Sequence, residues 1–201
     1  SPYTLSLHDA LPIYLPVDHP DGNPHAFAIC VEAHDSAHLA DVVTLRAHAT
    51  FLDELEDESL STLSSSSDSL SSSLILTPHA SDVVHLSCLS TIACLSPSAR
   101  TTILHQIVAL AIWLRDQATP PPRFGRLSRR VLLYCADGYS ETSLLALTCV
   151  MLEKRCNAPE AYLYLQLEAE RSFFVYPRDV ETVVAVERKV KEVLRSEERR
   201  V

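Results

Sequence analysis

The chain has 201 residues, of which 47% are hydrophobic and 21% are charged, and its formal net charge at pH 7 is −9. The length suits a single domain, and the hydrophobic content is sufficient for a packed core. The negative charge argues against nonspecific nucleic-acid binding and against docking on an anionic membrane surface, because both of these partners are themselves negatively charged.

The two ends of the chain resemble translated sequencing adapter. Ser6–Ile13 reads SLHDALPI and Arg195–Val201 reads RSEERRV, and one DNA segment read in opposite orientations can encode both. We therefore expect residues 1–13 and 195–201 to be library artefacts, to be set aside before the fold is considered, as a cloning scar is. On this hypothesis residues 14–194 are a fragment of a longer protein.

The cysteine and histidine spacings do not predict a metal centre. None of the six cysteines forms a C-x-x-C pair, and no cysteine and histidine pairing has zinc-finger spacing. His34 and His38 are four residues apart, but no third ligand joins them, so we expect surface histidines and neither a metal nor a cofactor. With no apolar run of about 18 residues, we expect a reducing cytoplasmic location, with the nucleus as the alternative.

The first part of the chain predicts an N-terminal α/β part over residues 14–60. Ala26–Ala33, AFAICVEA, is typical of a buried strand, and Ala37–Leu55 favours a helix of mixed quality. Ser61–Ser73, STLSSSSDSLSSS, is a low-complexity stretch. Its composition predicts a flexible insertion that is open to phosphorylation.

Residues 74–194 are expected to form the α/β core. Leu74–Leu76 favours a short strand, whereas Val83–Leu95 is apolar without a clear period, so a strand and a helix both remain open. Thr101–Gln117 predicts an amphipathic helix. Its expected inward face consists of Ile103, Ile107, Leu110, Ala111 and Leu114.

Further helices are predicted toward the C-terminus. Glu141–Arg155 has a helical pattern in which Cys149 reads as a small core residue. Asn157, followed by proline and then by Glu160 at the third helical position, predicts a capped helix start, with the helix running to about Arg171. Asp179–Leu194 predicts a last helix, whose mostly inward residues are Val183, Val184, Val186, Val190 and Val193.

The most informative segment joins a predicted strand to the helix at Glu141. An apolar run, Val131–Tyr134, leads directly into Cys135. In such a strand–loop–helix unit the loop N–H groups and the positive helix end converge on an anion. The same field lowers the pKa of a cysteine thiol and makes it a nucleophile. The candidate phosphate loop comprises Cys135, Ala136, Asp137, Gly138, Tyr139, Ser140, Glu141 and Thr142.

This segment resembles the Cys-x5-Arg phosphate loop of cysteine-dependent protein phosphatases, in particular the dual-specificity branch. By this resemblance Cys135 is the nucleophile, Gly138 the tight-turn glycine, and Thr142 the hydroxyl that assists the leaving thiolate. Tyr134 stands where the family has histidine. The sequence CADGYSETSLLAL and the later RSFFVYPRDV are similar to the N-terminal, loop-altered domain of a group of fungal dual-specificity phosphatases.

The resemblance implies a fold, a reaction and partners. The fold would be an α/β phosphatase-like domain with a central sheet flanked by helices and an irregular N-terminal half. The family hydrolyses phosphotyrosine, phosphoserine and phosphothreonine through a cysteinyl-phosphate. The partner would be a phosphoprotein or another protein, and a catalytic domain with an intact loop would follow downstream in the full-length protein.

Two departures from the family pattern favour a different role for this domain. Glu141 replaces the arginine that clamps the phosphate, and its repulsion of a phosphate dianion in a poorly solvated loop costs on the order of several kcal/mol. The general acid is also missing, since the preceding helix offers only Asp116 and Asp82 lies further back. The alternative is therefore a catalytically impaired pseudophosphatase that acts in docking or regulation.

Simpler interpretations of the same residues also remain open. Cys135 could pack between strand and helix, and Glu141 could be a helix-start acid that interacts with the macrodipole. A sulfurtransferase with a cysteine-led anion loop is a third class, disfavoured by the phosphatase-like residues after Arg155.

Overall fold

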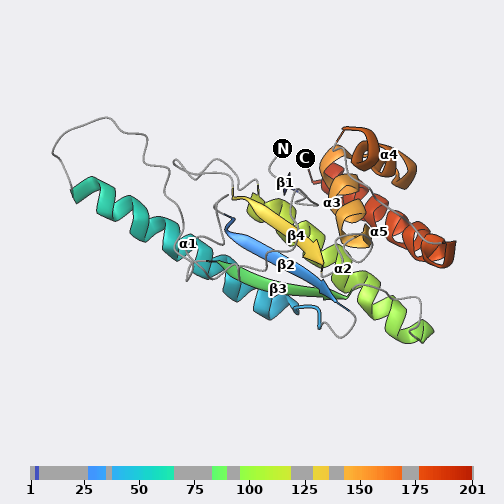
Figure 1. The fold of residues 1–201 in the computed structure, drawn as a ribbon, viewed down its shortest axis with the longest axis horizontal. Helices are drawn as coiled ribbons and strands as arrows, with labels where there is room; N and C mark the ends of the chain where they lie inside the picture. Colours follow the sequence, from blue (N-terminus) through green and yellow to red (C-terminus); the bar gives the residue numbers. More distant parts are fainter. Residues whose placement is uncertain are drawn as a thin grey trace.

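The computed structural model describes residues 3–4, 27–34, 38–65, 83–89, 96–118, 129–135, 143–168 and 177–200. They form an α/β fold in which a parallel sheet is flanked by helices (Figure 1). The sheet has three main strands in the order β4-β2-β3, and a two-residue strand, β1, pairs with the start of β4. The strands are β1 (Tyr3–Thr4), β2 (Ile29–His34), β3 (Val84–Leu89) and β4 (Val131–Cys135).

Alternating side chains give the sheet two different faces. Ile29 of β2 is in register with Val84 of β3 and with Val131 of β4, and all three are buried in the main core. The intervening residues face the other way, because side chains alternate along a strand. There Cys30 belongs to a smaller apolar cluster, against which Leu132 packs.

Among the described residues, α1 and α2 connect successive strands, and the later helices form a C-terminal group. None of them is both long enough and apolar enough to cross a bilayer. They are α1 (Val42–Ser65), α2 (Pro97–Ala118), α3 (Ser143–Lys154), α4 (Ala158–Leu163), which continues as the π-helical turn η2 (Tyr164–Glu168), then the 3-10 turn η3 (Pro177–Asp179) and α5 (Val180–Glu198).

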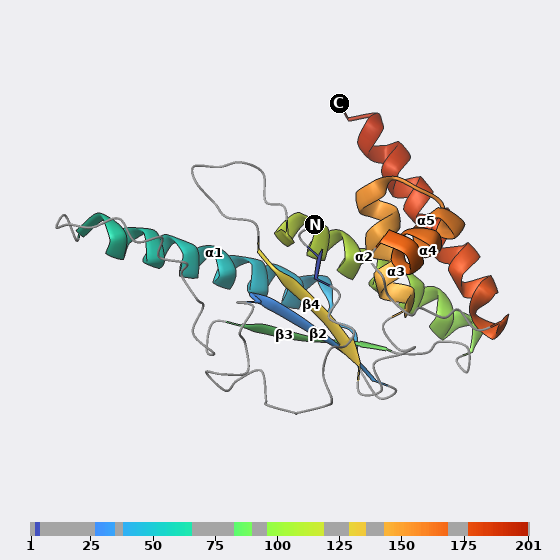
Figure 2. The same ribbon diagram turned by 45° about the horizontal axis from the view of Figure 1, so that its top comes forward.

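The two crossover helices lie on the same side of the sheet. Figure 2 shows α1 and α2 together above it, and Leu45 and Leu52 of α1 share one buried cluster with Ile107 of α2. The first crossover leads from β2 to its neighbour β3. The second crossover leads in the opposite direction across the sheet, from β3 past β2 to β4. The two crossovers therefore have opposite hands, and one of them belongs to the left-handed class that makes up only about 2% of such connections.

A buried arginine joins the two crossover helices to the start of β4. Arg129 donates from Nε to Oε1 of Glu56 at 2.6 Å and from Nη2 to Oδ1 of Asp53 at 2.8 Å. Its Nη1 donates to Oε1 of Gln117 on α2. These contacts tie α1 and α2 to the start of β4 on the face of the sheet that both helices occupy.

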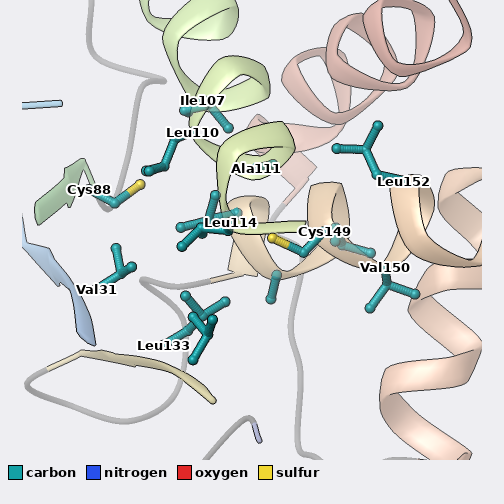
Figure 3. Close-up of a cluster of buried hydrophobic side chains, with 14 of the residues drawn as sticks. Val31, Cys88, Ile107, Leu110, Ala111, Leu114, Leu133, Cys149, Val150 and Leu152 are labelled. Atoms are coloured by element: carbon teal, nitrogen blue, oxygen red, sulfur yellow. The ribbon is translucent and has the colours of Figure 1, made fainter. Parts of the chain in front are cut away.

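The core forms where α2 and α3 meet the sheet (Figure 3). The predicted inward face of α2 is confirmed: Ile107, Leu110, Ala111 and Leu114 are completely buried, and Ile103 is partly buried. Cys149 of α3 is buried as predicted.

Several element boundaries differ from the sequence-based expectations. Val83–Leu95, which the sequence left open, contains the strand β3. Helix α1 extends through Ser65 into the serine-rich stretch, because lengthening an existing helix adds a hydrogen bond for each residue fixed. The remainder of that stretch and the predicted strand Leu74–Leu76 lie outside the described residues.

Toward the C-terminus the expected elements are present with altered ends. The capped start at Asn157 is confirmed, since its side chain accepts from the N–H of Glu160 and the Glu160 carboxylate accepts from the N–H of Asn157. The helix changes to π geometry at Tyr164, well before Arg171. In α5 the inward assignment of Val184 is wrong: this side chain is 49% exposed, while Thr182 is buried.

Candidate active site

The candidate phosphate loop starts at the carboxyl edge of the parallel sheet. Cys135 is the last residue of β4, and its Cα is in register with that of Ala33, one residue before the end of β2. In open α/β sheets, ligands bind outside the carboxyl ends of the strands. The Cys135 side chain and residues 136–142, which include the candidate loop from Ala136 to Thr142, lie outside what the structure describes.

The place of β4 in the strand order adds to this observation. After β2 the chain continues to β3, which pairs with one edge of β2, whereas β4 pairs with the other edge of β2. The carboxyl ends of β2 and β4 therefore lie side by side, with Ala33 in register with Cys135, at the edge of the sheet where α/β folds bind ligands.

A firmly packed helix begins on the other side of the candidate loop. Helix α3 starts at Ser143 and contacts both α2 and α5. It is buried on several faces, and its hydroxyl at Thr148 bonds back to the carbonyl of Leu144 at 2.7 Å. The buried residues of this helix are Leu145, Ala146, Leu147, Thr148, Cys149, Val150, Met151 and Leu152. A helix that begins shortly after the end of a strand provides the N–H groups that an anion-binding loop uses.

The buried Arg129 cannot replace the arginine that the candidate loop lacks. It precedes β4, at the amino end of the strand, whereas Cys135 is at the carboxyl end. At about 3.3 Å per strand residue, the two positions are roughly 20 Å apart. The guanidinium is also already paired with Asp53 and Glu56. These two carboxylates therefore neutralise the positive charge of Arg129, which does not act on a phosphate at the candidate loop.

The predicted general-acid candidates are not brought to Cys135 by the described part of the chain. Helix α2 runs back from the end of β3 to the start of β4, so Asp116 near its C-terminus lies at the amino end of the sheet. Its neighbour Gln117 contacts Arg129 there. Asp116 is exposed and pairs with Arg115 at 3.1 Å. Asp82 lies outside the described residues.

The three buried cysteines are structural rather than nucleophilic. Cys30, Cys88 and Cys149 are buried. Burial raises the pKa of the Cys88 thiol to about 12. Burial also raises the pKa of Cys149, and the charges of Cys88 and Glu153 add to this effect. Protonated thiols at neutral pH cannot attack phosphorus, because the thiolate is the nucleophile.

The two histidines four residues apart do not share a helix. His34 ends β2 and His38 lies in the connection that follows, where its carbonyl accepts a hydrogen bond from the Ser87 hydroxyl at 2.8 Å. Over the described ranges, no three His, Cys, Asp or Glu side chains gather in a way that could hold a metal ion.

The chain was also compared with known proteins. No protein-family model, no curated protein and no solved structure matches the chain.

Proposed function

We propose that this chain is a fragment of a dual-specificity protein phosphatase. In that reaction a cysteine thiolate attacks phosphorus, the serine, threonine or tyrosine oxygen leaves with a proton, and water then hydrolyses the cysteinyl-phosphate. The supporting observation is that Cys135 ends a parallel strand of the sheet and that a well-packed helix begins at Ser143. The seven residues between them have the length and sequence of a phosphatase-like phosphate loop.

Within such a protein, this domain acts in docking or regulation rather than in hydrolysis. Glu141 in the loop supplies a negative charge where a phosphate needs a positive one. Arg129, which could have compensated this charge, and Asp116, the general-acid candidate, are both at the other end of the sheet and are paired with other side chains. The partner is then a phosphoprotein or another protein, recognised without turnover.

Turnover of an aryl phosphate separates the two roles. We expect the whole chain to hydrolyse para-nitrophenyl phosphate no faster than its Cys135→Ser variant does. Cys156→Ser is the matched control, since Cys156 is a half-buried thiol outside the candidate loop. Hydrolysis that is lost with Cys135→Ser and kept with Cys156→Ser would assign catalysis to this domain and would contradict the docking role.

The fragment hypothesis has its own test, which does not depend on activity. A full-length transcript read across the locus is expected to diverge from the chain at both adapter-like ends. It is also expected to continue past codon 194 into a second domain with an intact His-Cys-x5-Arg loop. A genomic coding sequence that contains both ends in frame and stops after Val201 would overturn it.

A further inference from the structure

Helix α1 has apolar side chains both against the core and in solvent. Leu45 and Leu52 are buried, whereas Val43 is 73% exposed and Phe51 is 38% exposed. Ala47, midway between the last two, is exposed as well. Because residues four apart lie on one side of an α-helix, Val43, Ala47 and Phe51 form a single ridge, about 12 Å long at 1.5 Å per residue. We call these three residues the outer ridge.

The same side of α1 becomes acidic beyond the outer ridge. Glu54 and Asp57, three residues apart, are both exposed, and we call these two residues the acidic end. Their neighbours Asp53 and Glu56 pair with Arg129 instead. The carboxylates of α1 therefore have two different roles, because one pair attaches the helix to the start of β4 and the other pair faces solvent.

The position of α1 leaves this surface open to another molecule. The helix extends past the strands at the end opposite to α3, α4 and α5 (Figures 1 and 2). Apolar side chains that stay in solvent contribute nothing to folding through burial, but they can contribute to association. Exposed apolar side chains that are grouped and bordered by polar ones are typical of interaction sites.

We propose that the outer ridge and the acidic end form a docking surface for a basic amphipathic helix of a partner protein. A ridge of side chains four residues apart packs into the groove of a second helix, whose apolar anchors recur at the same spacing. Lysines or arginines beside those anchors would pair with Glu54 and Asp57. Arg46 is the only arginine or lysine in α1, so negative charge dominates the helix.

The charge of the chain favours this partner over other occupants. A second copy would bring the same carboxylates and its own net charge of −9, so like charges oppose self-association. A basic partner is instead attracted at long range. The surface lies between residues 43 and 57, clear of both adapter-like ends. It also excludes the candidate phosphate loop, so this proposal and the phosphatase proposal can fail independently.

The apolar part of the proposal is tested by fluorescence anisotropy with the full-length chain. The probe is a labelled peptide of about 20 residues, made of leucine, lysine and alanine with leucine at every third or fourth position. We expect Val43→Ser to weaken binding about fivefold, because it removes an apolar contact from the centre of the interface. The matched control is Val184→Ser, an exposed valine on α5, which should leave the affinity unchanged.

The acidic part is tested with the same probe. We expect Glu54→Gln to weaken binding about threefold, since it removes one partner of an exposed ion pair and keeps the side-chain size. Glu181→Gln is the matched control, because Glu181 is an exposed acid on α5 and its loss changes the net charge equally. Added salt should reduce the difference between the two variants, because it screens exposed charges.

The docking surface would be overturned by a wild-type chain that does not bind the peptide, or by equal affinities in either matched pair. Equal binding of a lysine and alanine peptide without leucine would also overturn it, since the ridge would then contribute nothing. A wild-type dimer in sedimentation that Val43→Ser dissociates would assign the ridge to a second copy instead. Circular dichroism checks the fold. If Val43→Ser loses helix, Val43→Ala and Val184→Ala give the same comparison, because alanine favours the helix.

Discussion

The guanidinium of Arg129 lies against the carboxylate of Glu56, with Nε 2.6 Å from Oε1, although 73 residues separate them in the chain. The arginine side chain is 5% exposed and the glutamate 24% exposed. A guanidinium that is this buried depends on its paired carboxylates, because removing one member of an ion pair leaves the other charged and poorly solvated. The pair therefore ties the position of α1 to the base of β4.

Replacing Arg129 with alanine should destabilise the protein by about 2 kcal/mol. This is less than the 3–5 kcal/mol typical of a fully buried pair, because Asp53 and Glu56 keep partial access to water. Urea unfolding measures the change. Arg130→Ala is the matched control: Arg130 is exposed and lies 5.8 Å from the centre of the Phe27 ring, so we expect a loss below about 1 kcal/mol. Equal losses in the two variants would show that the buried pair does not hold α1.

The capping box at Asn157 provides a second stability prediction. Asn157→Ala should cost about 1 kcal/mol, since the N–H of Glu160 loses its acceptor, whereas Asn157→Gly should cost only a few tenths. The comparison is informative because neither residue supplies a side-chain acceptor, while glycine leaves the freed N–H groups more open to water. Thermal unfolding of the two variants measures both. An alanine variant as stable as the glycine variant would argue against the cap.

The buried thiols predict a loss of stability in alkali. Burial raises the pKa of Cys88 from the ordinary 9.0 to about 12, and it raises that of Cys149 in the same direction. The unfolded chain then releases these protons at lower pH than the folded protein does. Their contribution to stability is therefore complete below pH 9 and is lost as pH rises toward the folded pKa values.

Each such thiol adds about 1.4 kcal/mol per pH unit to the fall in unfolding free energy. Urea titrations of wild type and Cys88→Ala at pH 8 to 10.5 measure the slope. The variant is expected to be less stable at pH 8, because it has a cavity, yet to lose stability less steeply above pH 9. Parallel curves would indicate that the Cys88 thiol ionises equally easily in both states.

The charge of Glu141 should determine whether the candidate loop binds an oxyanion. We expect Glu141→Arg to raise the affinity for vanadate or phosphate, since it replaces a repulsive carboxylate with a two-pronged donor. Calorimetry measures the affinity, and Glu160→Arg serves as a charge-matched control outside the loop, in the α4 cap. If both variants gain equally, the effect is a general change in net charge, and the loop is not an anion site.

Local sequence was a good guide to individual elements. The apolar run from Val131 predicted β4, and the residues from Ile107 to Leu114 predicted the buried face of α2, because each depends on the periodicity of one segment. Asn157 and Glu160 predicted their own cap for the same reason. Val184 was assigned inward wrongly, since a helical pattern alone does not say which edge of an apolar stripe the neighbouring helices will cover.

The candidate site was predictable only in part. The sequence indicated that Cys135 would end a strand before a helix, and the structure bears out the strand and a helix start at Ser143. It could not place Asp116 relative to that strand end, because the distance from Asp116 to Cys135 depends on the direction in which α2 returns across the sheet.

By itself the sequence determined the α/β class, the strands β2 and β4, most of the helices and the acidic charge, since these follow from composition and short-range periodicity, whereas β3 was left open between strand and helix. Only the tertiary structure decided the strand order, the face occupied by α1, and the meeting of Arg115 with Glu197 across 82 residues. These features depend on which distant surfaces bury each other, and long-range packing is chosen by the whole chain at once rather than by any one segment.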